Sequence, residues 1–199
     1  MPKYEEAEIP KSWVNTTLYD VCQKIQDGNY GGSYPKKDEW VEDGIPFITG
    51  AALGENCILE HKLRFVDEEK NSTLTKAQVT SNDVIFPNRG ATDSQLNGKS
   101  NLAYLLGDRF SNANINPQIT LLRSTDAVVP SYLKNYVCSP YFLDSLKEVT
   151  KGSALTFINL TKTKEIEIPL APLSEQKRIV EKLDSLLAQV DTIQQRLNN

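Results

Sequence analysis

Hydrophobic and polar residues alternate in short runs along most of the chain, with long polar stretches between the runs. Runs rich in β-branched and aromatic residues predict short strands. These runs occupy residues 45–50, 57–66, 83–87, 101–106, 117–124 and 164–170. Because helical patterns lie between some of these runs, we expect an α+β body of mixed strands and helices.

Helical spacing is found in three places within this body. Residues 18–25 carry apolar side chains at i, i+3, i+4 and i+7, with Thr17 placed to cap a helix and Gly28 to end it. Residues 68–79 have the composition of a short helix or turn. Residues 130–152 are helical, with a break at the second proline of that stretch.

The last 26 residues have a different pattern from the body. Ser174 is placed as an N-cap, and Glu175 in the first turn suits the helix dipole. Apolar residues then recur at steps of four and three, which is an a/d heptad seam: Ile179, Leu183, Leu186, Val190, Ile193 and Leu197. A helix of about 38 Å is too long to lie wholly on this body, so the seam predicts pairing with another helix. The alternative is a helix folded onto its own domain. We therefore divide the chain into a recognition body, residues 1–173, and a pairing helix, residues 174–199.

Composition narrows the class of protein. Of 199 residues, 39% are hydrophobic and 24% charged, which fits one globular core with an extension. The net charge of −4 argues against indiscriminate nucleic-acid binding but leaves room for a local basic patch. Three widely spaced cysteines without a CxxC pattern indicate reduced thiols. The first residues lack a secretory pattern and no run is long enough to cross a membrane, so we expect a cytoplasmic protein.

Two long polar loops, residues 27–44 and 88–100, hold side chains that suit contact with duplex DNA. Arg and Lys can bind guanine or phosphate, Asn and Gln can bind adenine, and hydroxyls can bind backbone oxygens. A shorter candidate lies at residues 151–153. The DNA-contact candidates are Asn29, Tyr30, Ser33, Tyr34, Lys36, Lys37, Asn88, Arg89, Thr92, Ser94, Gln95, Lys99, Lys151 and Ser153. From composition alone, ordinary solvated loops remain the alternative, and the aromatic residues would also fit a sugar or small-molecule binder.

Catalytic motifs are missing from the sequence. His61 is the single histidine, and its setting beside Glu60 and Lys62 favours an ordinary surface residue. There is no P-loop, no GxGxxG after a strand, no HExxH and no recognisable metal-ligand set. The segment "NINPQ" lacks the second proline and the aromatic residue of the amino-methylating motif. We therefore predict a binding protein rather than an enzyme, with no cofactor and no metal.

Several segments together resemble one known family. They are "IPKSWVNTTLYDVCQKIQDGNYGG", "GIPFITGAAL", "SNDVIFPNRGA" and, most specifically, "IEIPLAPLSEQKRIVEKLDSLLAQVD". The chain resembles the specificity subunit of a type I restriction-modification system over about residues 9–199. That family's full subunit has two target recognition domains and two long helices, so this chain is similar to half a subunit.

The resemblance implies a role. Each recognition domain would read one half of a split DNA site through the major groove, while the paired helices space two domains and dock methylation subunits. Methyl transfer and cleavage would belong to other chains, including restriction subunits. A half-length chain would then form a symmetric homodimer that favours a palindromic split target. Recognition domains of this family diverge strongly, so the DNA-contact candidates above rest on loop position and side-chain chemistry. A half that reads few base pairs is expected to bind weakly alone and in a salt-sensitive manner.

Two other readings stay open at this point. The chain could be a fragment of a fused restriction-methylation enzyme, which methyl-donor binding would favour. It could also be a coiled-coil scaffold whose loops read nothing. Exchanging the loops separates the cases, because a DNA reader changes its target and a scaffold does not.

Overall fold

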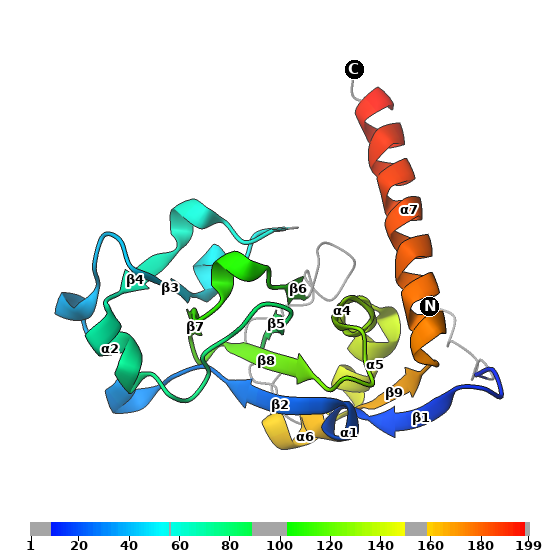
Figure 1. Ribbon diagram of the computed structural model, residues 1–199, viewed down its shortest axis with the longest axis horizontal. Helices are drawn as coiled ribbons and strands as arrows, with labels where there is room; N and C mark the ends of the chain where they lie inside the picture. Colours follow the sequence, from blue (N-terminus) through cyan, green and yellow to red (C-terminus); the bar gives the residue numbers. More distant parts are fainter. Residues whose placement is uncertain (1–8, 56, 89–102, 150–158, 198–199) are drawn as a thin grey trace.

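The computed structural model describes residues 9–55, 57–88, 103–149 and 159–197. These residues form a mixed body of three small sheets and short helices, from which one long helix projects (Figure 1). The architecture confirms the expected α+β class.

The central sheet has four strands in the order β2-β8-β5-β6, with every neighbouring pair antiparallel. Its strands are β2 (Cys22–Asp27), β8 (Ile119–Ser124), β5 (Val84–Pro87) and β6 (Tyr104–Leu105). Side chains alternate between the two faces of a strand. Phe86 and Leu122 accordingly belong to one hydrophobic cluster, whereas Ile85 and Leu121 belong to another. The sheet is therefore buried on both sides.

The first cluster lies between the central sheet and two consecutive helices, α4 (Pro130–Val137) and α5 (Pro140–Val149). Phe142 of α5 meets Phe86 of β5 edge to face, with the ring centroids 5.6 Å apart. Pro130 begins α4, as expected for a proline in a first helical turn. Pro140 begins α5, and Cys138 and Ser139 separate it from α4, which confirms the predicted break at this proline.

The second cluster joins the central sheet to a three-stranded sheet in the order β4-β3-β7. These strands are β3 (Ile45–Ile48), β4 (Arg64–Val66) and β7 (Asn114–Ile115). The helix α2 (Glu68–Thr73) follows β4, and a small core of Phe47, Val66 and Leu74 lies beneath it. Five 3-10 turns connect the described elements: Gly31–Ser33, Lys37–Glu39, Gly50–Ala52, Glu60–Lys62 and Asp108–Phe110.

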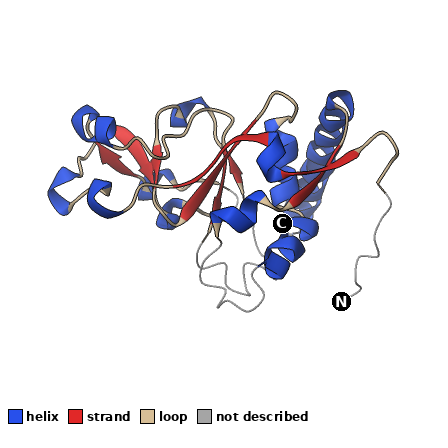
Figure 2. Cartoon of the chain, turned by 90° about the horizontal axis from the view of Figure 1, so that it is seen from below, coloured by secondary structure: helices blue, strands red, loops and turns tan. Residues whose placement is uncertain are grey.

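A two-stranded sheet forms the end of the body next to the long helix (Figure 2). It pairs β1 (Val14–Thr17) with β9 (Glu167–Leu170), antiparallel. The short helix α6 (Leu160–Lys164) precedes β9, and α7 (Leu173–Leu197) follows it. Strand β1 is thus held beside the segment that leads into α7.

Two predicted elements were wrong in extent. Thr17 caps a helix as predicted, with the Asp20 amide donating to Thr17 Oγ1 at 3.3 Å, but this helix, α1, spans only Leu18–Val21. From Cys22 onward the chain is strand β2, because pairing with β8 overrides the helical periodicity. The predicted strand at residues 57–66 is likewise mostly a bridge and a 3-10 turn, and only Arg64–Val66 is strand.

The start of α7 also differs from the prediction. The helix begins at Leu173, so Ser174 is its second residue and not its N-cap. The amides of Glu175 and Gln176 both bond to the Pro172 carbonyl, at 2.8 and 2.9 Å. Backbone bonding therefore begins the helix two residues earlier than an N-cap at Ser174 would place it.

Other sequence expectations can be compared with the described residues. No disulfide joins Cys22, Cys57 and Cys138. His61 is exposed on the Glu60–Lys62 turn, as expected of a surface residue. Across the residues that the structure describes, no helix combines the length and apolar character needed to cross a membrane.

Candidate nucleic-acid interface

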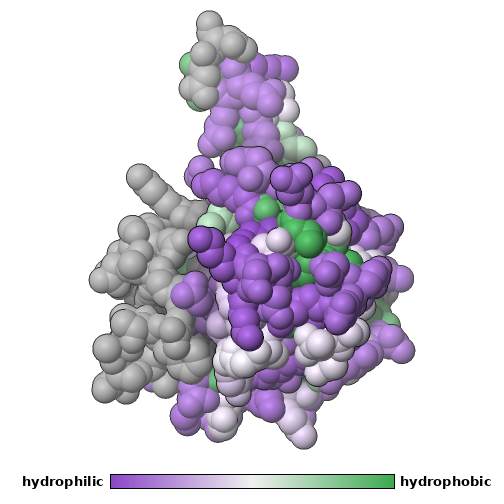
Figure 3. Space-filling view, turned by 90° about the vertical axis from the view of Figure 1, so that its left-hand side faces the viewer, coloured by the Kyte–Doolittle hydropathy of each residue, from purple (hydrophilic) through white to green (hydrophobic). Residues whose placement is uncertain are grey.

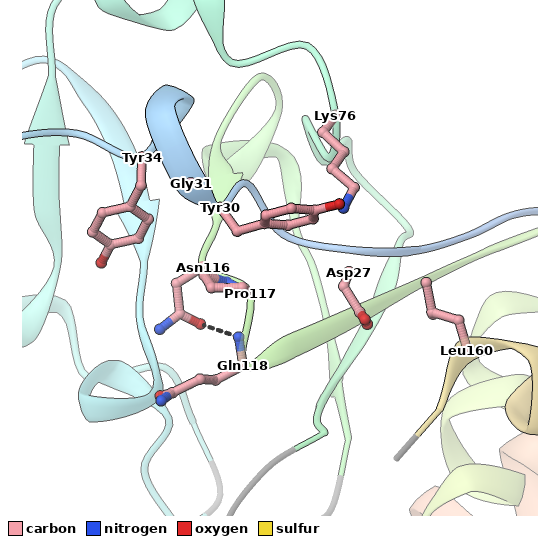
Figure 4. Close-up of a pocket in the computed structure, with 9 residues that line it drawn as sticks. All are labelled: Asp27, Tyr30, Gly31, Tyr34, Lys76, Asn116, Pro117, Gln118 and Leu160. Atoms are coloured by element: carbon pink, nitrogen blue, oxygen red, sulfur yellow. Dashed lines mark hydrogen bonds between the residues drawn. The ribbon is translucent and has the colours of Figure 1, made fainter. Parts of the chain in front are cut away.

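An open pocket of about 740 Å³ lies where the first polar loop meets the turn that precedes β8 (Figure 4). Its lining combines aromatic, amide and charged side chains with two backbone turns. The lining residues are Asp27, Tyr30, Gly31, Tyr34, Lys76, Asn116, Pro117, Gln118 and Leu160. The first polar loop, residues 27–44, was predicted to contact DNA, and several of its residues line this pocket. The predicted contact residues are therefore compared with this lining below.

A buried polar network holds the end of β2 to β8 and β5 below this pocket. Asp27 Oδ1 accepts hydrogen bonds from Asn88 Nδ2 at 2.7 Å and from Thr120 Oγ1 at 2.5 Å. Asn88 Nδ2 also donates to the Pro117 carbonyl at 3.1 Å. These buried hydrogen bonds link the ends of β2, β5 and β8, whereas Asn88 Oδ1 has no partner among the described residues.

The Asn116–Gln118 turn is held by backbone and side-chain bonds on both sides. The Asn116 amide donates to the Ile48 carbonyl at 3.1 Å, and Asn116 Oδ1 accepts from the Gln118 amide at 3.1 Å. The carbonyl of Gln118 accepts from the Asn88 amide at 2.9 Å. A Cβ atom at Gly28 would lie 2.1 Å from the Asn116 carbonyl oxygen, so only glycine allows the first loop to approach this turn.

Tyr30 and Lys76 form an exposed edge of the pocket. Tyr30 is 60% exposed, and Lys76 Nζ lies 3.5 Å from the centroid of its ring. Lys76 is itself positioned through its amide, which donates to Asn29 Oδ1 at 3.3 Å. An aromatic ring with an adjoining ammonium group is a combination that can contact a base and a phosphate.

Tyr34 has a mainly structural position although it also lines the pocket. Its ring meets Trp40 and Phe47 edge to face, at centroid distances of 6.0 and 5.6 Å. Arg64 caps this aromatic group, with Cζ 3.5 Å from the Trp40 ring centroid. The aromatic residues that could have suggested a sugar site therefore pack largely against one another.

Two of the predicted DNA contacts need correction. Asn29 and Asn88 are each only 1% exposed, and their side chains bond within the chain. Both act as positioning residues, because neither amide is accessible to a base from solvent. Sequence reasoning could not separate an accessible asparagine from one that serves a buried network.

The other predicted contacts have three outcomes. Tyr30 and Tyr34 line the pocket. Ser33, Lys36 and Lys37 do not, although both lysines are exposed on the adjoining loop and Ser33 Oγ donates to the Tyr30 carbonyl at 3.0 Å. The following predicted contacts lie outside the described residues: Arg89, Thr92, Ser94, Gln95, Lys99, Lys151 and Ser153.

Seven lining residues were not among the predicted contacts. Asp27 and Gly31 lie in the first polar loop, whereas the other five lie outside the predicted loops: Lys76, Asn116, Pro117, Gln118 and Leu160. The Asn-Pro pair between two strands was an available turn signal. The pair lies in the "NINPQ" segment, and only the folded chain brings it beside the first loop. No group of three or more His, Cys, Asp or Glu side chains is placed to hold a metal ion in the described part of the chain.

The second candidate surface is the apolar face of α7. Six of its side chains are at least one-third exposed, and they are Leu183, Leu186, Leu187, Val190, Ile193 and Leu197. Five of these are seam positions that the sequence predicts, whereas Leu187 widens the seam. Ile179 requires correction, because it packs against the body's own first cluster. In space-filling view the helix stands clear of a largely hydrophilic face of the body (Figure 3).

The base of α7 is fixed to the body by Gln176, which is fully buried. Its Oε1 accepts from the Val129 amide at 2.8 Å, and its Nε2 donates to the carbonyls of Ala171 at 2.8 Å and Ala127 at 3.0 Å. Trp13 Nε1 adds a bond to Glu175 Oε2 at 3.1 Å. The direction in which the helix leaves the body is thus set by several bonds.

The described residues thus form a mixed sheet body with a polar pocket, from which one long helix projects. Residues 10–199 match the family described as the type I restriction modification DNA specificity domain. The chain belongs to this family.

The relatives are specificity subunits. The type I restriction enzyme StySPI specificity subunit of Salmonella potsdam is 36% identical over 194 residues, covering 96% of this chain and 39% of the relative. The EcoBI specificity subunit of Escherichia coli is 25% identical, covering 96% and 38%. The chain therefore spans about two fifths of the length of these relatives.

Solved structures show the same fold. The HsdS subunit from Thermoanaerobacter tengcongensis matches with a TM-score of 0.68 at 18% identity, covering 96% of this chain and 46% of that one. A chain from a structure of type I R-M complex assembly matches with a TM-score of 0.68 at 21% identity, covering 98% and 43%. These likenesses extend through the body and the terminal helix.

Proposed function

We propose that this protein reads one half of a split DNA site as the specificity component of a type I restriction-modification complex. The observation that carries the proposal is the family match over residues 10–199, since the relatives it joins are named specificity subunits. The pocket supports it as well, because its accessible groups are those that bind bases and phosphates. Methyl transfer and cleavage would belong to partner subunits, and the complex would act in the cytoplasm.

The proposed assembly uses two copies of the chain, each with a recognition body, residues 1–173, and a pairing helix, residues 174–199. Burial of an apolar side chain is favourable by roughly 1.5–3 kcal/mol, so the exposed face of α7 favours a partner helix. A symmetric pair would place two recognition bodies at a fixed separation, and the target would be a palindrome with a non-specific gap. The methylation subunits would dock on the paired helices and bring the restriction subunits with them.

Selection from a randomised duplex library tests this proposal. The full chain, co-purified with the methylation subunits of its system, is incubated with duplexes that contain about 25 random base pairs, and bound DNA is sequenced. We expect enrichment of two short motifs separated by a constant gap. Bound DNA with the same sequence distribution as the input would contradict the proposal.

A variant of the helix face is the internal control. Leu186→Glu with Val190→Glu leaves the recognition body intact, so the short motif should survive while the constant gap is lost. If the protein were a scaffold that does not bind DNA by sequence, the wild-type chain would enrich neither of the two short motifs. Exchange of residues 27–44 for the corresponding loop of a relative should change the motif in a reader only.

A further inference from the structure

The Asn116–Gln118 turn offers one accessible amide to the pocket. Among the pocket's polar side chains, Asp27 and Asn116 are only 7% exposed, and their oxygens accept hydrogen bonds within the chain. Gln118 is exposed, and no hydrogen bond to its side-chain amide is found within the described ranges. Gln118 is therefore the more exposed of the two amide side chains that line the pocket.

The backbone of Gln118 is fixed although its side chain is exposed. Its amide donates to Asn116 Oδ1 at 3.1 Å, and its carbonyl accepts from the Asn88 amide at 2.9 Å. The next residue, Ile119, is fully buried and begins β8. A side chain on such a fixed turn loses less conformational entropy on binding than one on a mobile loop.

The side chain of Gln118 extends away from Asp27 toward the Gly50–Ala52 turn, as Figure 4 shows. A Cβ atom at Gly50 would lie 3.5 Å from Gln118 Oε1, which is ordinary contact. Tyr30 and Lys76 lie on another side of the same pocket. One opening therefore combines an accessible amide, carried on a fixed backbone turn, with a separate positive group.

This arrangement suits the two kinds of contact that a DNA reader needs. A glutamine amide can form two hydrogen bonds with the major-groove edge of adenine. Its oxygen accepts from N6 while its nitrogen donates to N7. A lysine contacts phosphate and carries no sequence information directly. Gln118 is thus placed to specify a base, and Lys76 is placed to position the duplex.

We propose that Gln118 is a specificity-determining residue that reads an adenine of the half-site, while Lys76 contacts the DNA backbone. This inference rests on the proposed function and names the residue that gives it sequence preference. It predicts different effects for the two residues, because loss of a base contact changes the motif whereas loss of a phosphate contact weakens all sequences alike.

The same library selection tests the assignment with single variants. Gln118→Ala and the similarly long Gln118→Met should each lower the preference for adenine at one motif position by roughly 5- to 150-fold. Gln118→Arg should shift that position toward guanine. Lys76→Ala should keep the motif, weaken all binding and reduce the slope of log affinity against log salt by about 1.

Gln23→Ala is the matched control, since Gln23 is an exposed glutamine that does not line this pocket. It should leave both motif and affinity unchanged. A wild-type motif in both folded Gln118 variants would overturn the role of Gln118 while leaving the proposed function standing. Absence of any motif in wild type would overturn both. Uniform loss of preference at all positions in both variants would also overturn a single-base role.

Discussion

The two parts of helix α7 carry similar apolar residues but have different surroundings. From Leu173 to Val180 the helix lies against the body, with Gln176 fully buried and Ile179 and Val180 packed on the first core cluster. From Glu181 to Leu197 every residue is exposed. The first part behaves as an anchor and the second as an arm without a covering surface.

This difference shows what the fold needs from another molecule. The central sheet of the body is complete in itself, since described apolar clusters cover both of its faces. The arm is not, because an isolated helix gains its stability in water mainly from packing an apolar face. We infer that the anchor fixes the direction of the arm and that a second arm supplies the missing contact.

The largest expected effect comes from charging the arm. Leu186→Glu with Val190→Glu places two carboxylates on the apolar face, and a symmetric pair would bury four of them. The pairing dissociation constant should rise by at least about a thousandfold, since each buried apolar side chain contributes roughly 1.5–3 kcal/mol. Sedimentation velocity measures the change.

Ala188→Glu with Thr192→Glu is the control for that variant. It adds the same charge at the same four-residue spacing, on the opposite face of the helix. It should pair nearly as well as wild type. Equal dissociation of the two double variants would mean that charge, and not the apolar face, governs association.

The anchor should be broken by Gln176→Ala. The change leaves the Val129 amide and the carbonyls of Ala127 and Ala171 without their side-chain partner. We expect the free energy of unfolding to fall by about 2–4 kcal/mol, because unmet buried polar groups are unfavourable. Urea denaturation measures this. Gln189→Ala, at an exposed position on the arm, should change it by less than about 0.5 kcal/mol, and equal losses would contradict the anchor.

On the body itself, Gly28→Ala tests whether the pocket turn is rigidly supported. The added methyl would meet the Asn116 carbonyl oxygen, so the first loop must move away from the turn. We expect a loss of about 1–3 kcal/mol in stability and a weaker DNA motif. Gly32→Ala has open space around it and should be neutral. If Gly28→Ala and Gly32→Ala both leave the stability and the DNA motif unchanged, the position of the loop does not depend on this contact.

The smallest expected effect is a fall in the free energy of unfolding at alkaline pH. It arises from buried groups that lie near the anchor. Burial raises the pKa of Tyr132 and Tyr136, whose hydroxyls donate to the Pro169 and Glu167 carbonyls of β9. Burial also raises the pKa of Cys22 from 9.0 to about 12. The unfolded chain would release these protons at lower pH than the folded chain, so the stability is present below about pH 9 and is lost as pH rises toward 12.

Urea midpoints at pH 8 and pH 10.5, with tyrosinate absorbance, measure this fall. Tyr136→Phe should make the slope shallower, whereas Tyr19→Phe, at an exposed tyrosine, should leave it as it is. A midpoint independent of pH in wild type would contradict the buried tyrosines as its source.

Local signals in the sequence predicted elements well, and contacts distant in sequence limited the prediction. The Thr17 cap was confirmed because a capping box needs only residues three apart. The helix expected to continue through Cys22 was wrong, because its partner strand lies about a hundred residues away. The seam of α7 followed from its period, but only the structure shows that Ile179 belongs to the body.

The candidate site was predictable in part for the same reason. Tyr30 stood out by its place in a long polar loop, and it lines the pocket. Gln118 did not, since it lies at the edge of a predicted strand and becomes accessible only through the folding of the Asn116 turn. Asn88 looked like a reader in sequence but serves a buried network with Asp27.

Sedimentation equilibrium of the full chain over a wide concentration range tests the central claim most directly. The account predicts a rise from the mass of one chain to the mass of two, abolished by Leu186→Glu with Val190→Glu. A single-chain mass at every concentration, with both proteins indistinguishable, would contradict the claim that the arm is covered by a second copy.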